Sequence, residues 1–316
     1  MNSEPVLFAL EGSREFGHAV ASQLGITLAA HEDRNFDDGE HKSRPLDSVR
    51  SRDVYVLLSL FGEDASSVND KLMRLLFFVA TVKDAGAKRV TALLPYLAYA
   101  RKDRRGKSQD PVTTRYVAQL FEAMGVDCVV ALEVHNQGAF ENAFRCQTVH
   151  LEAHGLFVAT LMEHVGNEPV VIVSPDAGGT KRVDRFRDAW ADAAGEQPPT
   201  AFLEKHRKDG EVTGDAVIGD MTGRVAIIVD DMVASGTTLL RAAEACKNKG
   251  ATKVFGVITH ALLGPGSEQL YRAGAMDQLF ITDSVSPQQA PDDQGQIATL
   301  AVAGLFAEAV RELHAG

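Results

Sequence analysis

The chain has 316 residues, 45% of them hydrophobic, and its 32 Lys and Arg against 43 Asp and Glu give a net charge of −11. This length exceeds what one compact core usually supports, so two domains are expected, and the apolar content excludes a disordered protein. The acidic balance disfavours nucleic acid and anionic membranes as partners. No apolar run approaches the roughly 20 residues of a membrane span, and no signal peptide is recognisable, so we expect a cytoplasmic protein.

The three cysteines lie far apart, in neither a CxxC nor a Cys/His spacing. The sequence therefore indicates no disulfide framework and no zinc site, and Cys128 and Cys246 are interpreted as ordinary buried thiols.

Short β-rich runs alternate with helical stripes of apolar residues along the whole chain. In the first half, strands are predicted at 54–58, 89–94 and 127–132, with stripes at Leu72, Leu75, Leu76 and Val79 and at Val117, Leu120, Phe121 and Met124. In the second half, strands are predicted at 170–173, 225–229 and 254–258, with a stripe at Leu239, Ala242, Ala243 and Cys246. This alternation predicts an α/β fold with a parallel sheet in each of two similar domains.

A short internal repeat, called the internal echo below, supports the prediction that the two halves are similar. The segments Lys83–Val90 and Lys247–Val254 both end a helix with Gly-Ala and then enter a strand. We place the boundary near residue 150, which gives an N-terminal domain at 1–150 and a C-terminal domain at 151–316. A last amphipathic helix, within 300–316, can cap either domain, the N-terminal one included.

The segment 226–238 carries the most informative chemistry. A buried apolar strand ends in Asp230 and Asp231, and a small-residue loop then leads directly into a helix. Ligands of open α/β sheets bind outside the carboxyl ends of the strands, and the free N–H groups of a helix N-terminus suit a phosphate. The two acids would repel that phosphate unless they accept hydrogen bonds from ribose hydroxyls. The alternative is that Ser235 or Thr237 is a plain N-cap and that both aspartates are solvated.

This segment resembles the phosphoribosyl-diphosphate loop shared by type I phosphoribosyltransferases and ribose-phosphate pyrophosphokinases. Three further segments resemble motifs of the pyrophosphokinases, in that family's order: Phe-x-Asp-Gly-Glu in 35–40, Pro-Tyr-x-x-Tyr-Ala-Arg-Gln-Asp-Arg in 95–105 and Ser-Pro-Asp-x-Gly-Gly in 174–179. Over nearly its whole length the chain is similar to a divergent pyrophosphokinase. The resemblance implies that each domain has a fold like that of type I phosphoribosyltransferases.

Two segments of the first domain suit a nucleotide. The Phe36 ring can stack on a purine, although a phenylalanine before a turn can also be a core residue. The segment from Arg101 to Lys107 is the densest basic run of an acidic chain, which suits an anionic nucleotide or a surface or subunit loop. The resemblance implies that ATP binds Phe36, Asp38, Gly39, Glu40, Arg101, Lys102 and Asp103.

A metal and a diphosphate are implied at two other strand ends. The resemblance implies that His135 and Asp176 ligate Mg²⁺, which prefers oxygen ligands and would need ATP phosphates to complete its shell. A lone histidine such as His135 is otherwise more often structural. Gly178 and Gly179 allow a backbone to approach a diphosphate closely. The basic residues that follow, Lys181, Arg182 and Arg185, form either part of that site or a solvated face.

The segment Lys205–Lys208 has no structural period and by itself indicates an exposed hairpin arm. The resemblance implies instead that Lys205 and Arg207 are catalytic and lie on a mobile loop. It also implies that ATP gives its diphosphoryl group to the 1-hydroxyl of ribose 5-phosphate, with AMP as the second product. Asp230 and Asp231 would hold the ribose hydroxyls. The 5-phosphate would bind Ala234, Ser235, Gly236, Thr237 and Thr238.

The chain departs from the family pattern at several positions. Lys102 replaces a Gln, Glu133 replaces an Asp, and 234–238 reads Ala-Ser-Gly-Thr-Thr where the family has Asp-Thr-Gly-Gly-Thr. Two other functions therefore stay open: a phosphoribosyltransferase that consumes phosphoribosyl diphosphate, and a catalytically silent regulatory homologue. The first predicts a single, shorter domain, and the second predicts loss of site residues that are present here.

A homo-oligomer is also expected, dimer-based and with a hexamer as one form. The resemblance implies that the loop from Tyr96 to Arg105 lies near a neighbouring subunit. Tyr96, Leu97 and Tyr99 favour burial, whereas the basic run beside them favours an anion, and a site shared between subunits would satisfy both.

Overall fold

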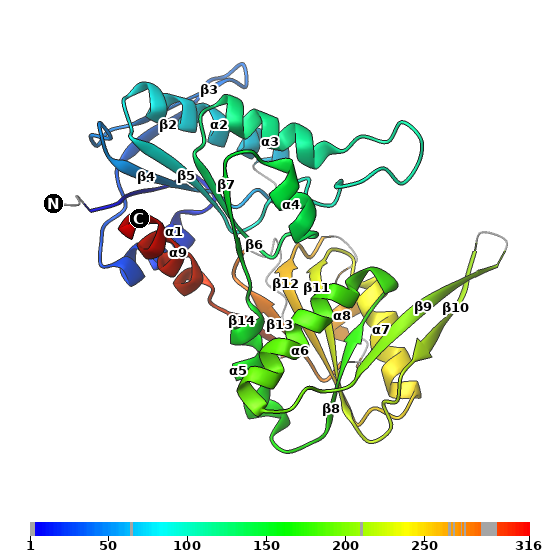
Figure 1. Cartoon of the computed structure of the whole chain (residues 1–316). Coiled ribbons are helices and arrows are strands. Elements are labelled where there is room, and N and C mark those ends of the chain that lie inside the picture. Colours follow the sequence, from blue (N-terminus) through cyan, green and yellow to red (C-terminus); the bar gives the residue numbers. More distant parts are fainter. Residues whose placement is uncertain are drawn as a thin grey trace. The chain divides into compact units, whose positions relative to one another are not determined.

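The computed structural model describes residues 4–63, 66–208, 211–264, 267, 269–272, 274, 276–285 and 296–316. It divides the chain into two compact units, Met1–Leu151 with Ala301–Gly316 and Glu152–Leu300. The last helix thus belongs to the first unit. Each unit is an α/β structure built on a largely parallel sheet, as predicted (Figure 1).

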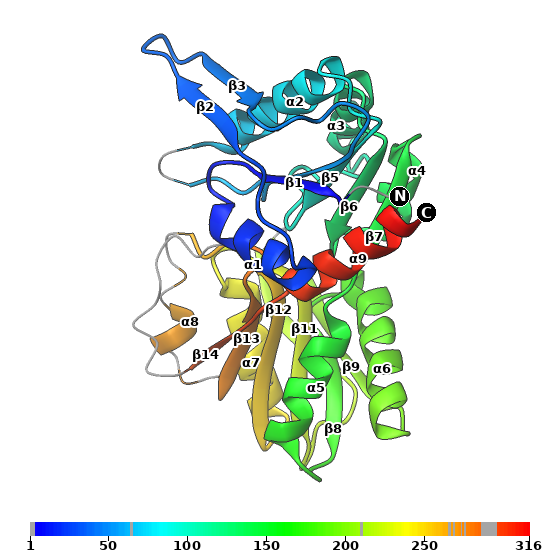
Figure 2. The same ribbon diagram turned by 90° about the vertical axis from the view of Figure 1, so that its left-hand side faces the viewer.

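The first unit contains a five-stranded parallel sheet in the order β1-β4-β5-β6-β7. Its strands are β1 (Val6–Ala9), β4 (Asp53–Leu57), β5 (Arg89–Leu94), β6 (Cys128–Leu132) and β7 (Gln147–Leu151). A separate antiparallel hairpin is formed by β2 (His31–Asn35) and β3 (His41–Pro45). The helices are α1 (Arg14–Leu24), α2 (Val68–Asp84), α3 (Thr113–Ala123), α4 (Gln137–Ala143) and α9 (Ala303–Ala315). Helices α2 and α3 cover one face of the sheet, and α1 and α9 cover the other (Figures 1 and 2).

The helices follow from their sequence signals. A capping box begins α2, because the Ser67 side chain accepts from the Asp70 N–H and Asp70 accepts from the Ser67 N–H. The predicted stripe that begins at Leu72 is the buried face of α2. In α3, Val117 and Phe121 are buried as predicted, but Leu120 is 43% exposed, so its place in the apolar stripe was wrong.

The second unit contains a seven-stranded sheet in the order β10-β9-β8-β11-β12-β13-β14, in which only the β9–β10 pair is antiparallel. Its strands are β8 (Val170–Ser174), β9 (Thr200–Lys208), β10 (Glu211–Ile218), β11 (Val225–Val233), β12 (Lys253–Ala261), β13 (Gln278–Thr282) and β14 (Ile297–Leu300). Its helices are α5 (His154–Val165), α6 (Thr180–Ala194), α7 (Thr237–Asn248) and α8 (Gln269–Arg272). Helices α5 and α6 lie on one face and α7 on the other (Figures 1 and 2).

The internal echo marks equivalent contacts in the two units. Asp127 Oδ2 accepts hydrogen bonds from the Val90 N–H at 2.7 Å and from Lys83 Nζ at 2.8 Å. In the second unit, Asp277 Oδ2 accepts from the Val254 N–H and from a lysine near the end of α7, each at 2.7 Å. The strand series β1-β4-β5-β6-β7 matches β8-β11-β12-β13-β14. The expected similarity of the two halves is therefore present in the contacts as well as in the strand order.

The two cysteines interpreted as structural are both buried and free. Burial raises the pKa of the Cys128 and Cys246 thiols to about 12, which keeps both thiols protonated and unreactive at neutral pH.

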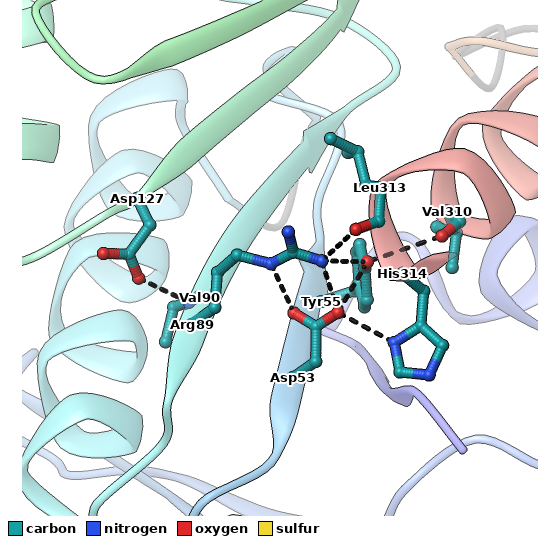
Figure 3. A network of polar contacts seen from close by, with 8 residues as sticks. All are labelled: Asp53, Tyr55, Arg89, Val90, Asp127, Val310, Leu313 and His314. Carbon is teal, nitrogen blue, oxygen red and sulfur yellow. Dashed lines mark hydrogen bonds and ion pairs between the residues drawn. The ribbon is translucent and has the colours of Figure 1, made fainter. Parts of the chain in front are cut away.

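A polar network fastens α9 to the first unit at the starts of β4 and β5 (Figure 3). Asp53 Oδ1 accepts from Arg89 Nε at 2.8 Å, and its Oδ2 accepts from the Tyr55 hydroxyl at 2.9 Å. The same Oδ2 accepts from His314 Nδ1 at 2.8 Å, and Arg89 also donates to the Leu313 carbonyl. Burial alone would raise the pKa of Asp53, but the hydrogen bonds from Arg89, His314 and Tyr55 lower it below its usual value.

We predict that Asp53→Asn weakens the docking of α9 and lowers the free energy of unfolding of the first unit by about 2 kcal/mol at neutral pH. Because the pKa of Asp53 is lower in the folded state, its contribution is complete above its ordinary pKa and is lost as the pH falls through the folded-state pKa. The deficit should therefore shrink in acid. Denaturant titration across pH and hydrogen exchange in α9 would test this.

The matched control is Asp192→Asn, at an exposed position on α6. It should change the free energy of unfolding by no more than about 0.5 kcal/mol. Equal stability losses in the two variants would show that the network does not hold α9.

Candidate active site

The site in the second unit lies where the direction of strand connection reverses. From β8 the chain crosses through α6 to β9 on one side, whereas from β11 it crosses through α7 to β12 on the other. Strands β8 and β11 pair in parallel, with Val173 beside Ile228, so their carboxyl ends meet at one edge. Such a switch point opens a crevice at the ends of the two strands. The turn after β8 is placed there, and so are Asp230 and Asp231, which follow the last residue of β11 that pairs with β8; β11 itself continues to Val233.

The turn after β8 is closed by its own aspartate. Asp176 Oδ1 accepts from the N–H groups of Gly178 and Gly179, at 2.8 and 3.2 Å. The Ser174 hydroxyl donates to the Asp176 carbonyl at 2.6 Å, and a Cβ on Gly179 would lie 2.5 Å from that hydroxyl oxygen. Glycine is therefore required at 179 by the turn itself. The two glycine N–H groups bond to Asp176 here, so the glycines offer close approach to a ligand more than hydrogen-bond donors.

The two predicted ribose acids share one arginine. Arg182 Nη1 lies 2.6 Å from Asp230 Oδ1, and Arg182 Nη2 lies 2.8 Å from Asp231 Oδ1. The Asp231 N–H also donates to Asp230 Oδ1, at 2.9 Å. Burial raises the pKa of Asp230, the Arg182 charge opposes this effect, and the Asp231 carboxylate adds to it. Neither acid is simply solvated, so that alternative was wrong.

Arg182 itself was missed by the sequence analysis, which left it among the basic residues after the turn. Its side chain is only 10% exposed, so it is part of neither a solvated face nor an open diphosphate site. Its position on the first turn of α6, directly after a turn at the switch point, was the one available signal.

The predicted phosphate loop is held in shape by α8. Gly236 is the N-cap of α7 with φ of +80°, and a Cβ there would lie 2.4 to 2.6 Å from carbons of Leu270. Gln269 Nε2 donates to the Ser235 carbonyl at 3.1 Å and to Thr237 Oγ1 at 3.4 Å. Since Gly236 is the N-cap, the alternative in which Ser235 or Thr237 caps α7 was wrong. The N–H groups at the start of α7 have no side-chain cap.

In the first unit, Phe36 begins the turn between β2 and β3. The Phe36 N–H donates to the Glu40 carbonyl at 2.8 Å, and the Glu40 N–H donates to Asp38 Oδ1 at 3.0 Å. The Phe36 side chain is 38% exposed, with the Arg34 guanidinium 5.0 Å from its ring centre, so it is not a core residue. Gly39 has φ of +90°, which suits glycine at this turn.

The hairpin is fixed to α2 by its inner face. Arg74 forms an ion pair with Asp33 and donates to Asn35 Oδ1 at 2.6 Å. The His41 ring stacks on Phe77 with ring centres 5.5 Å apart. These contacts with α2 hold the hairpin that carries the Phe36 turn.

The basic loop lies between β5 and α3. Arg101 and Lys102 are exposed, whereas Asp103 Oδ2 accepts from Asn136 Nδ2 at 2.7 Å. Asn136 is the N-cap of α4 and follows His135, so the structure brings Asp103 beside the segment of the predicted metal ligand. His135 is exposed and follows the end of β6.

The apolar residues of this loop do not need a neighbouring subunit. Leu97 is 4% exposed within the core of the first unit, and the Tyr99 hydroxyl bonds to Asn69. The conflict between burial and charge that we expected in this loop is therefore resolved within one chain, and that reason for an oligomer was wrong.

The predicted catalytic pair, Lys205 and Arg207, is described by its position in the β9–β10 hairpin. Lys205 and Arg207 lie on β9, opposite Asp215 and Val212 of β10. Together β9 and β10 form a hairpin arm that projects from the sheet (Figure 1). Among the residues that the structure describes, no group of three or more His, Cys, Asp or Glu side chains is arranged to hold a metal ion. Within the same residues, no helix is both long and apolar enough to cross a membrane.

Comparisons with known proteins cover nearly the whole chain. A family model for the N-terminal domain of ribose phosphate pyrophosphokinase matches residues 5–125, and one for the phosphoribosyl synthetase-associated domain matches residues 204–316. The chain is 33% identical to ribose-phosphate pyrophosphokinase 1 of Streptococcus pyogenes, covering 99% of this chain and 95% of the relative. It is also 33% identical to ribose-phosphate pyrophosphokinase A of Dictyostelium discoideum, covering 96% and 92%.

A solved structure is similar over the same extent. The crystal structure of phosphoribosylpyrophosphate synthetase from Mycobacterium smegmatis matches with a TM-score of 0.87 and 30% identity, covering 98% of this chain and 99% of that one.

We predict that Gly236→Ala lowers the affinity for ribose 5-phosphate by about tenfold or more, equal to about 1.4 kcal/mol. The new Cβ would displace Leu270 and reshape the loop that begins α7. Gly223→Ala is the matched control, because its φ of +69° carries a similar backbone cost while nothing lies within 4 Å of its Cβ. Calorimetric titration with ribose 5-phosphate would compare the affinities of the two variants. Equal affinities would contradict the prediction that the loop at 234–238 binds this substrate.

Proposed function

The chain belongs to the ribose-phosphate pyrophosphokinase family, and from that premise we propose that it transfers the diphosphoryl group of ATP to the 1-hydroxyl of ribose 5-phosphate, giving 5-phosphoribosyl 1-diphosphate and AMP. The observation that carries this proposal is the acid pair and phosphate loop at the β8–β11 switch point, in a chain similar to pyrophosphokinases over 95% of the relative's length. Two α/β units disfavour a single-domain phosphoribosyltransferase. The presence of all predicted site residues disfavours a silent homologue.

Ribose 5-phosphate is assigned to the second unit. Asp230 and Asp231 would accept hydrogen bonds from the ribose hydroxyls, because carboxylates at the end of β11 reach the crevice beside the phosphate loop. The 5-phosphate would bind the loop and the first turn of α7, whose N–H groups and dipole favour an anion. The loop residues in this role are Ala234, Ser235, Gly236, Thr237 and Thr238.

The nucleotide-binding residues are assigned to the first unit, and the diphosphate turn after β8 is assigned to the second. The exposed Phe36 ring offers a stacking face for adenine, and its own turn already presents Asp38, Gly39 and Glu40 beside it. Arg101 and Lys102 are exposed cations and would bind the anionic part of the nucleotide. Asp103, which directly follows them, is assigned to the same nucleotide-binding segment. The turn formed by Asp176, Gly178 and Gly179 would approach the diphosphate.

Magnesium fits as part of the nucleotide substrate. One imidazole and one carboxylate, His135 and Asp176, are too few ligands for a protein-held ion, and Mg²⁺ commonly keeps waters and phosphate oxygens in its shell. Asp176 suits the role because two backbone N–H groups fix its carboxylate through Oδ1. When bound, the ion would neutralise charge on the phosphates.

The chain's own residues would position the two substrates and neutralise the charge on the transferring group. The 1-hydroxyl oxygen attacks the β-phosphorus and loses its proton to water. The bond from that phosphorus to the oxygen bridging the α-phosphorus breaks, and AMP leaves with the bridging oxygen. Such transfer needs alignment and charge stabilisation more than covalent catalysis. Lys205 and Arg207 are assigned to neutralise the charge that develops on the transferring group.

We also propose a cytoplasmic homo-oligomer, dimer-based and with a hexamer as one form, with no nucleic acid partner. Support comes from the first unit, where α2 and α3 expose large apolar side chains. Those exposed by 40 to 49% are Met73, Phe77, Tyr116 and Leu120. Apolar surface of this kind is covered in stable assemblies, and a second copy of the chain is the occupant that the family membership favours.

The reaction itself gives the first test. Incubation with ATP, ribose 5-phosphate and magnesium should yield AMP and phosphoribosyl diphosphate in equal amounts, and chelation of the metal should abolish both. We expect no reaction without ribose 5-phosphate. Chromatography of the nucleotides would identify the products. ADP as the stoichiometric product would rule out diphosphoryl transfer.

The second test concerns assembly. Leu120→Ser should shift the protein toward a smaller species in sedimentation, because it places a hydroxyl in the proposed contact. Ile218→Ser is the matched control, since Ile218 is 44% exposed against 43% for Leu120 but lies on β10. A wild-type protein that sediments as an active monomer would refute the oligomer.

A further inference from the structure

We propose that Arg182 is the positioning residue that sets Asp230 and Asp231 in the geometry needed to bind the ribose hydroxyls. The inference rests on the proposed function and adds to the reaction a residue that does not itself touch the substrate.

The guanidinium contacts define this role. Its two terminal nitrogens are divided between the carboxylates, at 2.6 Å to Asp230 Oδ1 and 2.8 Å to Asp231 Oδ1. A planar fork with two donors fixes the separation and orientation of two acceptors, which a single point charge cannot do. Both bonds engage Oδ1 atoms, so Arg182 does not occupy the Oδ2 atom of either carboxylate.

Arg182 also packs against the turn that follows β8. A Cβ added to Gly179 would lie 3.5 Å from Arg182 Nη1, so the glycine leaves room for the guanidinium. Asp176 holds the same turn through the Gly179 N–H. One buried side chain therefore lies against the proposed diphosphate turn and pairs with both proposed ribose acids.

The charge of Arg182 is as necessary as its shape. Adjacent carboxylates repel each other, and in a site where Asp231 is only 6% exposed that repulsion is poorly screened. Without Arg182, Asp230 would take up a proton more readily and would lose acceptor capacity for the sugar. Arg182 from α6 is charged and pairs with both acids, and His154 from α5 interacts electrostatically with Arg182, Arg185 and Glu152. Burial lowers the pKa of His154 to about 4, so His154 stays neutral in the range in which Asp230 would titrate.

A direct substrate role for Arg182 is disfavoured by its environment. Its side chain is 10% exposed and both of its terminal nitrogens are bonded to aspartates. To reach a phosphate it would have to leave two buried carboxylates without a counter-charge, which is costly. The geometry instead suits a residue that acts through the acids.

The test is a kinetic comparison of Arg182→Gln with wild-type enzyme. We expect the KM for ribose 5-phosphate to rise by about tenfold to a hundredfold, the usual scale for loss of an outer partner of a ligand-binding group. The KM for ATP should change little, and kcat at saturating sugar should fall far less than kcat/KM. Raising the pH from about 6 to about 9 should lower the KM of the variant more steeply than that of wild type, because Asp230 then regains its charge.

Two further variants make the outcome decisive. Arg187→Gln, on the same helix, removes a bond of 2.6 Å to the Pro198 carbonyl but does not touch the acids, and it should leave the KM for ribose 5-phosphate unchanged. Arg182→Lys retains the charge without the fork, so it should give a KM between those of wild type and Arg182→Gln.

Each alternative outcome has one meaning. A folded Arg182→Gln with unchanged KM for ribose 5-phosphate, or with equal losses for ATP and sugar, overturns the positioning role. If that variant does not fold, Arg182→Lys decides, and a wild-type KM there overturns the role as well. Wild-type enzyme that forms no AMP from ATP and ribose 5-phosphate refutes the proposed function itself, which keeps the two failures distinct.

Discussion

The parallel pairing of β8 with β11 is the constraint on which the proposed site depends. It brings the carboxyl end of β8 to one edge of the sheet beside β11. A turn closed by Asp176 and the two aspartates, Asp230 and Asp231, that follow the last β8–β11 pair therefore lie at the same edge although they are some fifty residues apart. Arg182, whose side chain is 10% exposed, pairs with both carboxylates at this point and supplies an opposite charge. The phosphate loop is then shaped from its other side by Leu270.

The same scaffold is used twice for different purposes. The strand series of the first unit repeats that of the second, and in both an aspartate bonds to a lysine at the end of a helix and to the N–H of the next strand. In each unit an antiparallel hairpin comes after the helix that follows the first strand, α1 in the first unit and α6 in the second. Hairpin β2–β3 carries the proposed adenine contact, and β9–β10 carries the proposed catalytic pair. The first unit closes with α9, which the Asp53 network holds in place (Figure 3).

Several interpretations of single residues were wrong because the surroundings of a residue in the fold cannot be read from its local sequence. Ser235 and Thr237 resemble helix caps in isolation, but Gly236 takes the N-cap because Leu270 packs where its side chain would be. Leu97 looked like a residue that needs a partner subunit, yet the core of its own unit buries it. Leu120 fits a helical stripe by spacing and is nevertheless exposed. At Gly236 and at Leu97, contacts with residues distant in sequence decided the outcome.

The sequence by itself determined the α/β plan, the near-duplication of the two halves, and the motifs that identify the family. Those properties depend on periodicity, on glycine stops and on residue order, which are local and survive divergence. The tertiary structure alone decided which side chain neutralises the paired aspartates and which helix shapes the phosphate loop. Arg182 lies 48 residues from Asp230, and Gln269 lies 34 residues from Ser235, so neither contact leaves a local pattern. Burial and charge compensation at a crevice are properties of the folded chain, because only folding brings such groups out of water and within bonding distance of one another.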